Sequence, residues 1–230
     1  GWVYLVKDVK RLTAYMRKEY PQVPFFLYGH GMGSLVARLC CLYDSPWDGV
    51  ILSGTSSRQK FCRRSVLALA LLRRIKGVNH RSGLVESMVY GRLNRKFRKE
   101  KEGLSWFSED RETRDRYKAD KCTQFRFTLK AYENIFKMLA LVSTRKWYRS
   151  LSVETPILLI SGKEDPIGDF GKGITDIHHR MLEMGCLADI HLYDGIRHEL
   201  QSAPRHEEIF NDMLKWMKNH MEPQTVNGIY

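Results

Sequence analysis

The sequence predicts an α/β fold with a mostly parallel sheet and helices flanking both of its faces. Short apolar runs without alternation occur at 25–28, 50–52 and 157–160. A strand that is apolar throughout is buried on both faces, which is typical of parallel sheets. Amphipathic stretches with helical spacing separate these runs, and parallel strands need crossover connections of that kind.

The expected elements follow one another along the chain. A helix over 3–19 precedes the strand at 25–28, and Pro21 and Pro24 separate the two. The remaining elements are a helix over 35–43, the strand at 50–52, a helix around 129–141, the strand at 157–160, a helix through 174–184, a strand at 189–193 and a helix over 207–221.

The length of the chain and its alternation of strands and helices predict one α/β core that carries an insertion. The chain has 230 residues, which suits one sizeable domain. The alternation of strands and helices stops between 55 and 150, where helical segments occur without a comparable apolar run. We therefore divide the chain into a first core part at 1–54, a helical insertion at 55–150, a second core part at 151–222 and a flexible tail at 223–230.

Composition predicts a cytoplasmic protein without a membrane span. Hydrophobic residues make up 43% and charged residues 28%, as in globular proteins, and no apolar run approaches the length of a spanning helix. No secretory signal is visible. The five cysteines are odd in number and lack CxxC spacing, which favours a reducing compartment and argues against disulfides and structural zinc.

The net charge of +12 is concentrated in one stretch. Residues 58–101 contain 14 Lys and Arg against two acidic residues, a local charge of 14 − 2 = +12. Such a stretch suits an anionic membrane surface, and residues 66–72, flanked by arginines, are a candidate contact, so the protein is expected to be peripheral at membranes. A solvated basic face, or a buried helix with snorkelling arginines, explains the same pattern. Nucleic acid is not expected, because no binding motif accompanies the charge.

A glycine-rich turn, GHGMGS at 29–34, joins the strand at 25–28 to the next helix. Strand, sharp turn and helix form the context of the nucleophile elbow G-x-S-x-G, which holds its serine in a strained conformation. The spacing is intact, but Gly31 stands where the serine is expected. Ser34 lies about one helical turn further on and is not expected to replace it.

The other elbow residues are Gly29, His30 and Gly33. Glycines at the flanking positions allow strand and helix to approach closely. A simple tight turn between strand and helix is the plainer interpretation. Dinucleotide binding is excluded, because the third glycine of G-x-G-x-x-G is replaced by Ser34 and no acidic residue ends the strand at 50–52.

Two later turns supply an acid and a histidine in the chain order of a hydrolase triad. Asp165 follows the strand at 157–160, and its Asp-Pro turn suits a carboxylate aimed back at the sheet better than Glu164 does. An ordinary Asx-turn is the alternative. His198 ends the loop after the strand at 189–193 and is predicted to be a general base oriented by Asp165. No metal-ligand spacing occurs, so neither a metal nor a cofactor is expected.

Four segments together resemble the α/β-hydrolases of the monoacylglycerol lipase and lysophospholipase-like group, also called serine aminopeptidase-like. They are YGHGMGS at 28–34, where that group has GHSMGS, DGVILSG at 48–54, SGKEDP at 161–166 and YDGIRHE at 193–199. The resemblance covers almost the whole chain and is weakest at 55–150.

The resemblance implies an α/β-hydrolase fold in which the insertion is a helical cap over an acyl pocket. It implies a serine ester hydrolase or lipase that acts on an acyl ester or lipid-like substrate without a cofactor, with the N–H of Met32 as one oxyanion donor. Relatives carry further N-terminal strands and a second donor before the position of Gly1, so the chain is expected to be N-terminally truncated.

With Gly31 at the nucleophile position, we expect the chain to be inactive or strongly impaired as an ester hydrolase. Two alternatives remain. One is a non-catalytic pseudo-hydrolase, or pseudoenzyme, that binds a lipid-like ligand or a protein partner. The other is residual hydrolysis, in which His198 and Asp165 activate a water in the space of the missing side chain.

Overall fold

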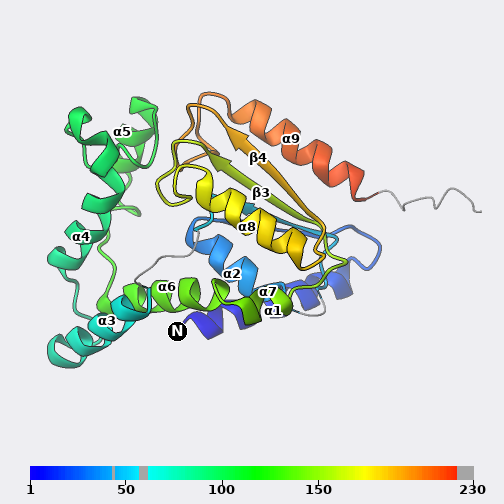
Figure 1. The fold of residues 1–230 in the computed structure, drawn as a ribbon, viewed down its shortest axis with the longest axis horizontal. Helices are drawn as coiled ribbons and strands as arrows, with labels where there is room; N and C mark the ends of the chain where they lie inside the picture. Colours follow the sequence, from blue (N-terminus) through cyan, green and yellow to red (C-terminus); the bar gives the residue numbers. More distant parts are fainter. Residues whose placement is uncertain (43–44, 57–61, 222–230) are drawn as a thin grey trace, which may run out of the picture.

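The structure, a computed structural model, describes residues 1–42, 45–56 and 62–221. Its centre is a four-stranded sheet in the order β1-β2-β3-β4. All pairings between these strands are parallel, and helices cover both faces (Figure 1). The strands are β1 (Phe26–His30), β2 (Gly49–Ser53), β3 (Ile157–Gly162) and β4 (Ala188–Tyr193). The predicted α/β fold with a parallel sheet is confirmed.

The helices of the core lie close to where the sequence predicts them. They are α1 (Trp2–Glu19), α2 (Met32–Cys40), α8 (Lys172–Glu183) and α9 (His206–Asn219). The largest difference is in α2, which begins three residues earlier than predicted because the turn at Gly31 leads straight into the helix. The predicted end of that helix and the tail at 223–230 fall on residues outside the described part of the chain.

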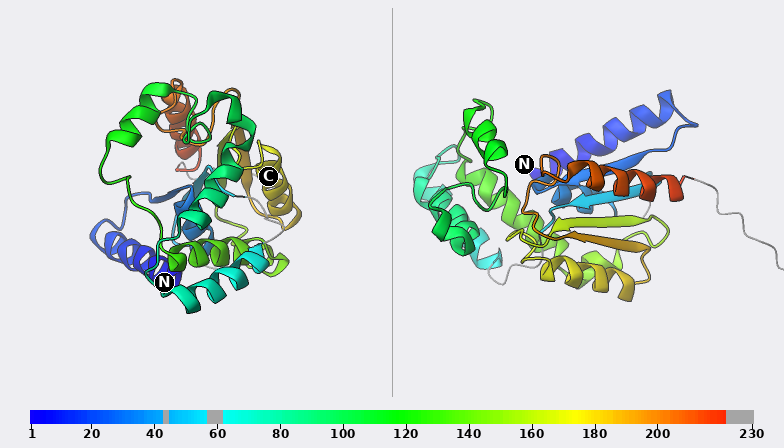
Figure 2. Two further views of the ribbon diagram at one scale, coloured as in Figure 1. Left: turned by 90° about the vertical axis from the view of Figure 1, so that its left-hand side faces the viewer. Right: turned by 90° about the horizontal axis from the view of Figure 1, so that it is seen from above.

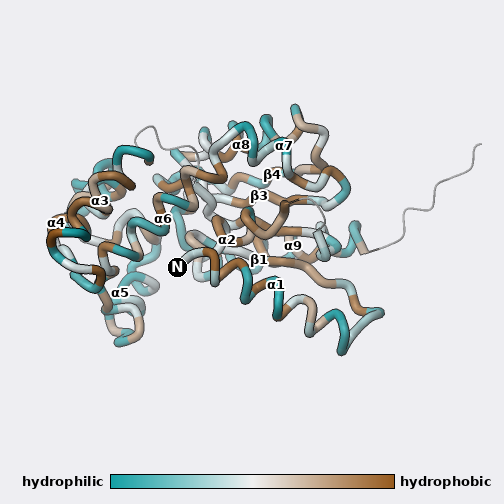
Figure 3. The backbone as a smooth tube through the Cα atoms, turned by 90° about the horizontal axis from the view of Figure 1, so that it is seen from below, coloured by the Kyte–Doolittle hydropathy of each residue, from teal (hydrophilic) through white to brown (hydrophobic). Residues whose placement is uncertain are grey.

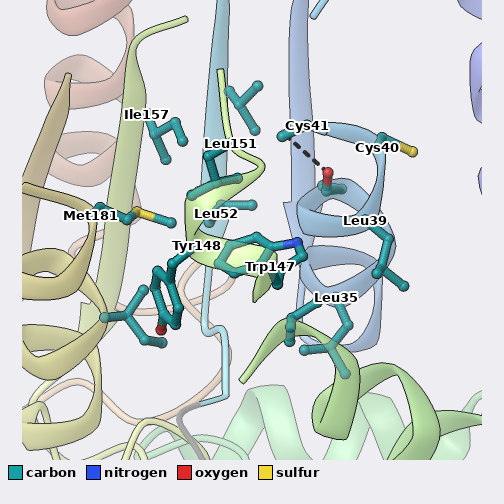
Figure 4. Close-up of a cluster of buried hydrophobic side chains, with 14 of the residues drawn as sticks. Leu35, Leu39, Cys40, Cys41, Leu52, Trp147, Tyr148, Leu151, Ile157 and Met181 are labelled. Carbon is teal, nitrogen blue, oxygen red and sulfur yellow. Dashed lines mark hydrogen bonds between the residues drawn. The ribbon is translucent and has the colours of Figure 1, made fainter. Parts of the chain in front are cut away.

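Alternate residues of the strands build two separate cores. Val50, Leu52, Ile157 and Leu159 pack against α2 and α8 in the larger core, part of which is drawn in Figure 4. Ile51, Leu158 and Ile160 point to the other face, where they pack against α9. Both faces of the inner strands are therefore buried, which explains why these strands are apolar without alternation.

Six helices and no strand occur among the described residues between β2 and β3. They are α3 (Cys62–Lys76), α4 (Gly83–Leu93), the short 3₁₀ helix η1 (Asn94–Glu100), α5 (Arg111–Ala119), α6 (Leu129–Val142) and α7 (Arg145–Arg149). Helices α3, α4 and α5 gather at one end of the molecule (Figure 2). The side chains of Ser82, Asp110 and Thr128 cap α4, α5 and α6 by accepting a backbone N–H of the first turn.

Helices α6 and α7 connect this segment to the larger core. Met138 and Val142 of α6 and Trp147 of α7 belong to the same buried cluster as α2. Figure 4 shows Trp147 and Tyr148 side by side in that cluster. The part of the segment that stands away from the sheet therefore runs from α3 to α5, and we call α3, α4, η1, α5 and the turns between them the cap. No helix in the described part of the chain is long and apolar enough to cross a membrane.

Candidate active site

The turn between β1 and α2 has the strained backbone that a nucleophile elbow requires. Gly31 lies at φ +53° and ψ −117°, a conformation that strains any residue with a side chain. Its N–H donates to the carbonyl of Ser53 at the end of the neighbouring strand, at 3.0 Å. The hydroxyl of Ser34 donates to the carbonyl of Gly31 at 2.5 Å, so this serine serves the turn and not the site.

The two flanking glycines act in different ways. A Cβ on Gly29 would lie 2.6 Å from the carbonyl oxygen of Gly33 and 2.9 Å from the Cβ of Ala37. The close approach of strand and helix predicted from the sequence therefore depends on Gly29. A Cβ on Gly33 would meet nothing within 4 Å, so close approach does not explain that glycine.

Asp165 and His198 lie together at the carboxyl ends of β3 and β4. His198 Nδ1 is 2.9 Å from Asp165 Oδ2, and their side chains are 7% and 0% exposed. The other carboxylate oxygen, Oδ1, accepts the N–H of Ile167 at 2.8 Å, which forms an Asx-turn. The two interpretations of Asp165 are thus compatible, since one oxygen shapes the turn while the other orients the imidazole.

The free edge of this imidazole faces the elbow. A Cβ built on Gly31 would lie 3.2 Å from His198 Nε2. A hydroxyl one bond further out would be within hydrogen-bonding reach of that nitrogen. The fold therefore brings together Gly31, His198 and Asp165, three positions separated by up to 167 residues (198 − 31) in sequence.

Met32 is the first residue of α2. Its N–H is one of the four at a helix N-terminus that have no acceptor within the helix, and the positive end of the helix dipole lies there. Such a donor beside the elbow tip suits a developing oxyanion. The side chain of Met32 is 42% exposed.

The surroundings of His198 favour its charged form. Burial in itself lowers the pKa of His198, but the charge and hydrogen bond of Asp165 outweigh it, so the pKa lies above its usual value. An imidazole held in this way is oriented and more basic than a free histidine. Both properties suit a group that takes up a proton and holds it during the reaction.

A second histidine lies against the first. The rings of His30 and His198 have centroids 4.7 Å apart. His30 Nδ1 is 3.0 Å from the Ser53 hydroxyl, and its Nε2 is 3.5 Å from Glu199 Oε2. Burial raises the pKa of Glu199, yet the hydrogen bond and charge of His30, together with the charge of His198 and a backbone hydrogen bond, lower it by more. Sequence reasoning placed His30 in the elbow but did not find its link to Glu199.

Two further residues shape the space around His198. Gly54 has φ +53°, and a Cβ there would lie 2.9 Å from His198 Cε1, so only glycine fits. Its position directly after a buried strand was the available signal. Trp106 comes from the cap, with its ring centroid 5.3 Å from that of His198. Nothing in the local sequence points to Trp106, because the contact joins residues 92 positions (198 − 106) apart.

A groove of about 890 Å³ lies far from these groups. It is lined by residues at the amino ends of β2, β3 and β4, among them Trp47, Pro156 and Ala188. The site described above lies at the opposite ends of the same strands. Among the described residues, no three His, Cys, Asp or Glu side chains are arranged to hold a metal ion.

Comparison with known proteins gives a consistent picture. The model of a family described as serine aminopeptidase, S33, matches residues 1–204. The chain is 22% identical over 224 residues to a monoglyceride lipase homolog of Monkeypox virus, covering 94% of this chain and 71% of that protein. It is also 22% identical over 220 residues to a monoacylglycerol lipase of Mycolicibacterium smegmatis, covering 94% and 70%.

Solved structures show the same architecture. A thermostable carboxyl esterase from Bacillus coagulans, determined in complex with glycerol, superposes with a TM-score of 0.89 at 22% identity. The match covers 96% of this chain and 73% of the esterase. At this level of identity the likeness concerns the fold, which is that of the α/β-hydrolases.

Proposed function

The chain belongs to the serine aminopeptidase, S33 family of α/β-hydrolases, and we propose that its site is that of a lipid ester hydrolase with position 31 as the place of the nucleophile. Relatives named as monoglyceride and monoacylglycerol lipases, and a structural neighbour named as a carboxyl esterase, support a carboxylic ester of a lipid as the substrate class. The observation that carries the proposal is the 3.2 Å between His198 Nε2 and a Cβ at Gly31.

Each residue of the site has a distinct proposed role. A hydroxyl at position 31 would attack the acyl carbon while His198 Nε2 takes its proton. Asp165 keeps the proton of His198 on Nδ1 and stabilises the imidazolium that forms. The N–H of Met32 would stabilise the negative charge on the acyl oxygen. His198 then returns the proton to the departing alcohol, and water releases the acyl group by the same steps.

The chain as it stands has no side-chain hydroxyl at position 31 to begin these steps. Loss of the nucleophile in a related triad costs on the order of 10⁶ in kcat. We therefore propose that this chain holds its ligand without forming an acyl-enzyme, in a site that retains its base and its orienting acid.

Ester turnover by two variants tests this function. Gly31→Ser and Gly31→Ala carry the same added Cβ and the same backbone strain, of about 1–3 kcal/mol, but differ by one hydroxyl. With p-nitrophenyl acyl esters we expect turnover by Gly31→Ser and only background from Gly31→Ala. Adding His198→Ala should abolish the gained activity, while His179→Ala on α8 should not change it. Equal rates for the two variants at position 31 would rule out the proposed role of that position.

We also propose that the cap contacts an anionic lipid surface. Leu67, Leu71 and Ile75 of α3 are 71%, 62% and 70% exposed, and their spacing of four places them on one face of the helix. Leu69 of the same helix is buried against α6. Helix α4 adds Leu84 and Met88, which are 72% and 67% exposed.

Basic residues lie at both ends of α3. The first turn of this helix contains Arg63 and Arg64, and its last turn contains Arg74 and Lys76, while Arg73 pairs with Glu133 of α6 at 2.7 Å. Figure 3 shows hydrophobic and hydrophilic stretches alternating along α3 and α4 at the far end of the molecule from α9. An apolar face bordered by Lys and Arg is the pattern that binds the interface of an anionic membrane.

Vesicle sedimentation tests the surface. We expect binding to vesicles that contain phosphatidylglycerol, little binding to pure phosphatidylcholine, and loss of binding as salt is raised. Ile75→Glu should weaken binding, whereas Leu182→Glu, at an exposed position on α8, should not. Binding that is equal on both lipids and insensitive to Ile75→Glu would contradict this surface.

A further inference from the structure

Three consecutive side chains of the loop after β4 bind three different parts of the molecule. His198 bonds Asp165 in the loop after β3. Glu199 pairs with His30 of the elbow. Arg197 points into the cap, where its guanidinium meets η1 and the turn that follows it. The residue before the predicted base thus ties that base to the cap.

The contacts of Arg197 are extensive for one side chain. The residue is 8% exposed, and its guanidinium forms a two-pronged pair with Glu100 of η1. The same group donates to the carbonyls of Ser105 and Ser108 at 2.6 and 3.3 Å. It also lies over the ring of Phe97, 4.1 Å from the centroid. Bidentate Arg–carboxylate pairs fix geometry as well as charge.

Backbone bonds strengthen this attachment on both sides of His198. The N–H of Arg197 donates to Glu109 Oε2 at 2.9 Å. The N–H of Glu199 donates to the carbonyl of Phe107 at 2.8 Å. Residues 105–109 of the cap are therefore hydrogen-bonded both to the residue before His198 and to the residue after it.

The helix η1 also reaches the loop that carries the acid. Lys96 lies over the ring of Phe170, 4.2 Å from its centroid. Phe170 donates its N–H to the carbonyl of Asp165 at 2.9 Å. Its φ of +55° is strained for an aromatic residue, so the surrounding contacts must maintain this conformation. Arg197 Nε in turn lies 3.6 Å from Glu164 Oε2 in this loop. One short helix of the cap thus contacts both loops.

We propose that Arg197 is a positioning residue. It holds η1 against the loops that carry Asp165 and His198, so that the position of the cap determines the geometry of this pair. The inference rests on the proposed function of the pair. Because the guanidinium is buried, its removal leaves the carboxylate of Glu100, which is 35% exposed, and the carbonyl of Ser105 without this partner. A cap that lifts, for example on a lipid surface, would release Arg197 and with it the alignment of the base.

The test compares Arg197→Met with Lys163→Met. Lys163 forms an exposed pair with Asp194, which also joins the loops after β3 and β4 but does not involve the cap. In the Gly31→Ser background, Arg197→Met should lower kcat/KM by about 10- to 100-fold, as expected for a displacement of the base by up to 1 Å. Lys163→Met should leave kcat/KM unchanged.

A second readout does not depend on activity. Histidine labelled at Cε1 reports by NMR the pKa of His198 in the chain with Gly31. Arg197→Met should lower this pKa toward the usual value of histidine, because the bond to Asp165 loosens, and Lys163→Met should not. Arg197→Lys keeps the charge without the two-pronged geometry, and we expect it to restore the pKa only in part.

If Arg197→Met does not fold, Glu100→Gln replaces it, since it weakens the same pair from a side chain that is 35% exposed. An unchanged pKa of His198 in Arg197→Met, or in Glu100→Gln where that replaces it, would overturn the inference. If Gly31→Ser is inactive while the pKa of His198 responds as expected, the positioning role of Arg197 is supported and the proposed catalytic function is contradicted. The two proposals therefore fail in distinguishable ways.

Discussion

Replacing Asp165 by asparagine should change both the titration of His198 and the stability of the fold. The carboxylate lies 2.9 Å from Nδ1, and the two side chains are 0% and 7% exposed. Asparagine has nearly the same shape and can still accept the N–H of Ile167, so the turn should persist. What is lost is the negative charge beside the imidazole.

The sign of the effect follows from the pKa of His198. Burial alone lowers this pKa, and the charge and hydrogen bond of Asp165, with a smaller contribution from the charge of Glu199, raise it by more. In Asp165→Asn we therefore expect the pKa to fall below the usual value of about 6.5. Because the folded-state pKa is raised in the unmodified chain, the pairing contributes stability that is present at low pH and lost as pH rises through that pKa.

The magnitude should match the smaller of two known costs. Removing one partner of a buried pair costs about 3–5 kcal/mol, whereas losing a charged hydrogen bond costs about 1.5–3 kcal/mol. Since asparagine retains a hydrogen bond, we expect about 1.5–3 kcal/mol near pH 5.5 and less near pH 9. Urea unfolding at both pH values, with NMR titration of His198, measures this. A stability loss independent of pH, or an unchanged pKa, would refute the assigned pairing.

Two further predictions concern glycines and use urea midpoints as the measurement. Gly54→Ala should destabilise by more than Gly77→Ala, because both residues have positive φ but only the first would place a Cβ 2.9 Å from His198; equal losses would contradict the contact. Gly29→Ala should destabilise by more than about 1 kcal/mol, since its Cβ would clash with the backbone of α2, while Gly33→Ala should be neutral or stabilising. The opposite order would show that strand and helix do not approach at Gly29.

Much of the sheet could be predicted because its physics is local. Runs such as 157–160 are apolar since both faces are buried, and the structure only extends this strand to Gly162. The positions of the turns also follow from topology. Asp165 and His198 each come after a parallel strand, and the carboxyl ends of parallel strands meet at one edge.

What the sequence did not reveal depends on contacts between distant residues. Trp106 reaches His198 from the cap, and neither periodicity nor a motif indicates such a contact. The sequence shows the positive charge of residues 58–101, but it does not show which of these residues are exposed to solvent. Only the structure separates the buried Leu69 from the exposed Leu71 two positions later. The role of Arg197 likewise could not be predicted from the sequence, because a charge pattern does not say which carboxylate an arginine contacts.

Position 31 is tested most directly by covalent labelling of Gly31→Ser with a fluorophosphonate, followed by measurement of the intact mass. The probe reacts with a serine whose hydroxyl is activated by a neighbouring base. We predict one added label in Gly31→Ser, its loss on adding His198→Ala or Asp165→Asn, and none in Gly31→Ala. A folded Gly31→Ser protein that takes up no label, while His198 still titrates as the partner of Asp165, would contradict the claim that this turn is a nucleophile elbow.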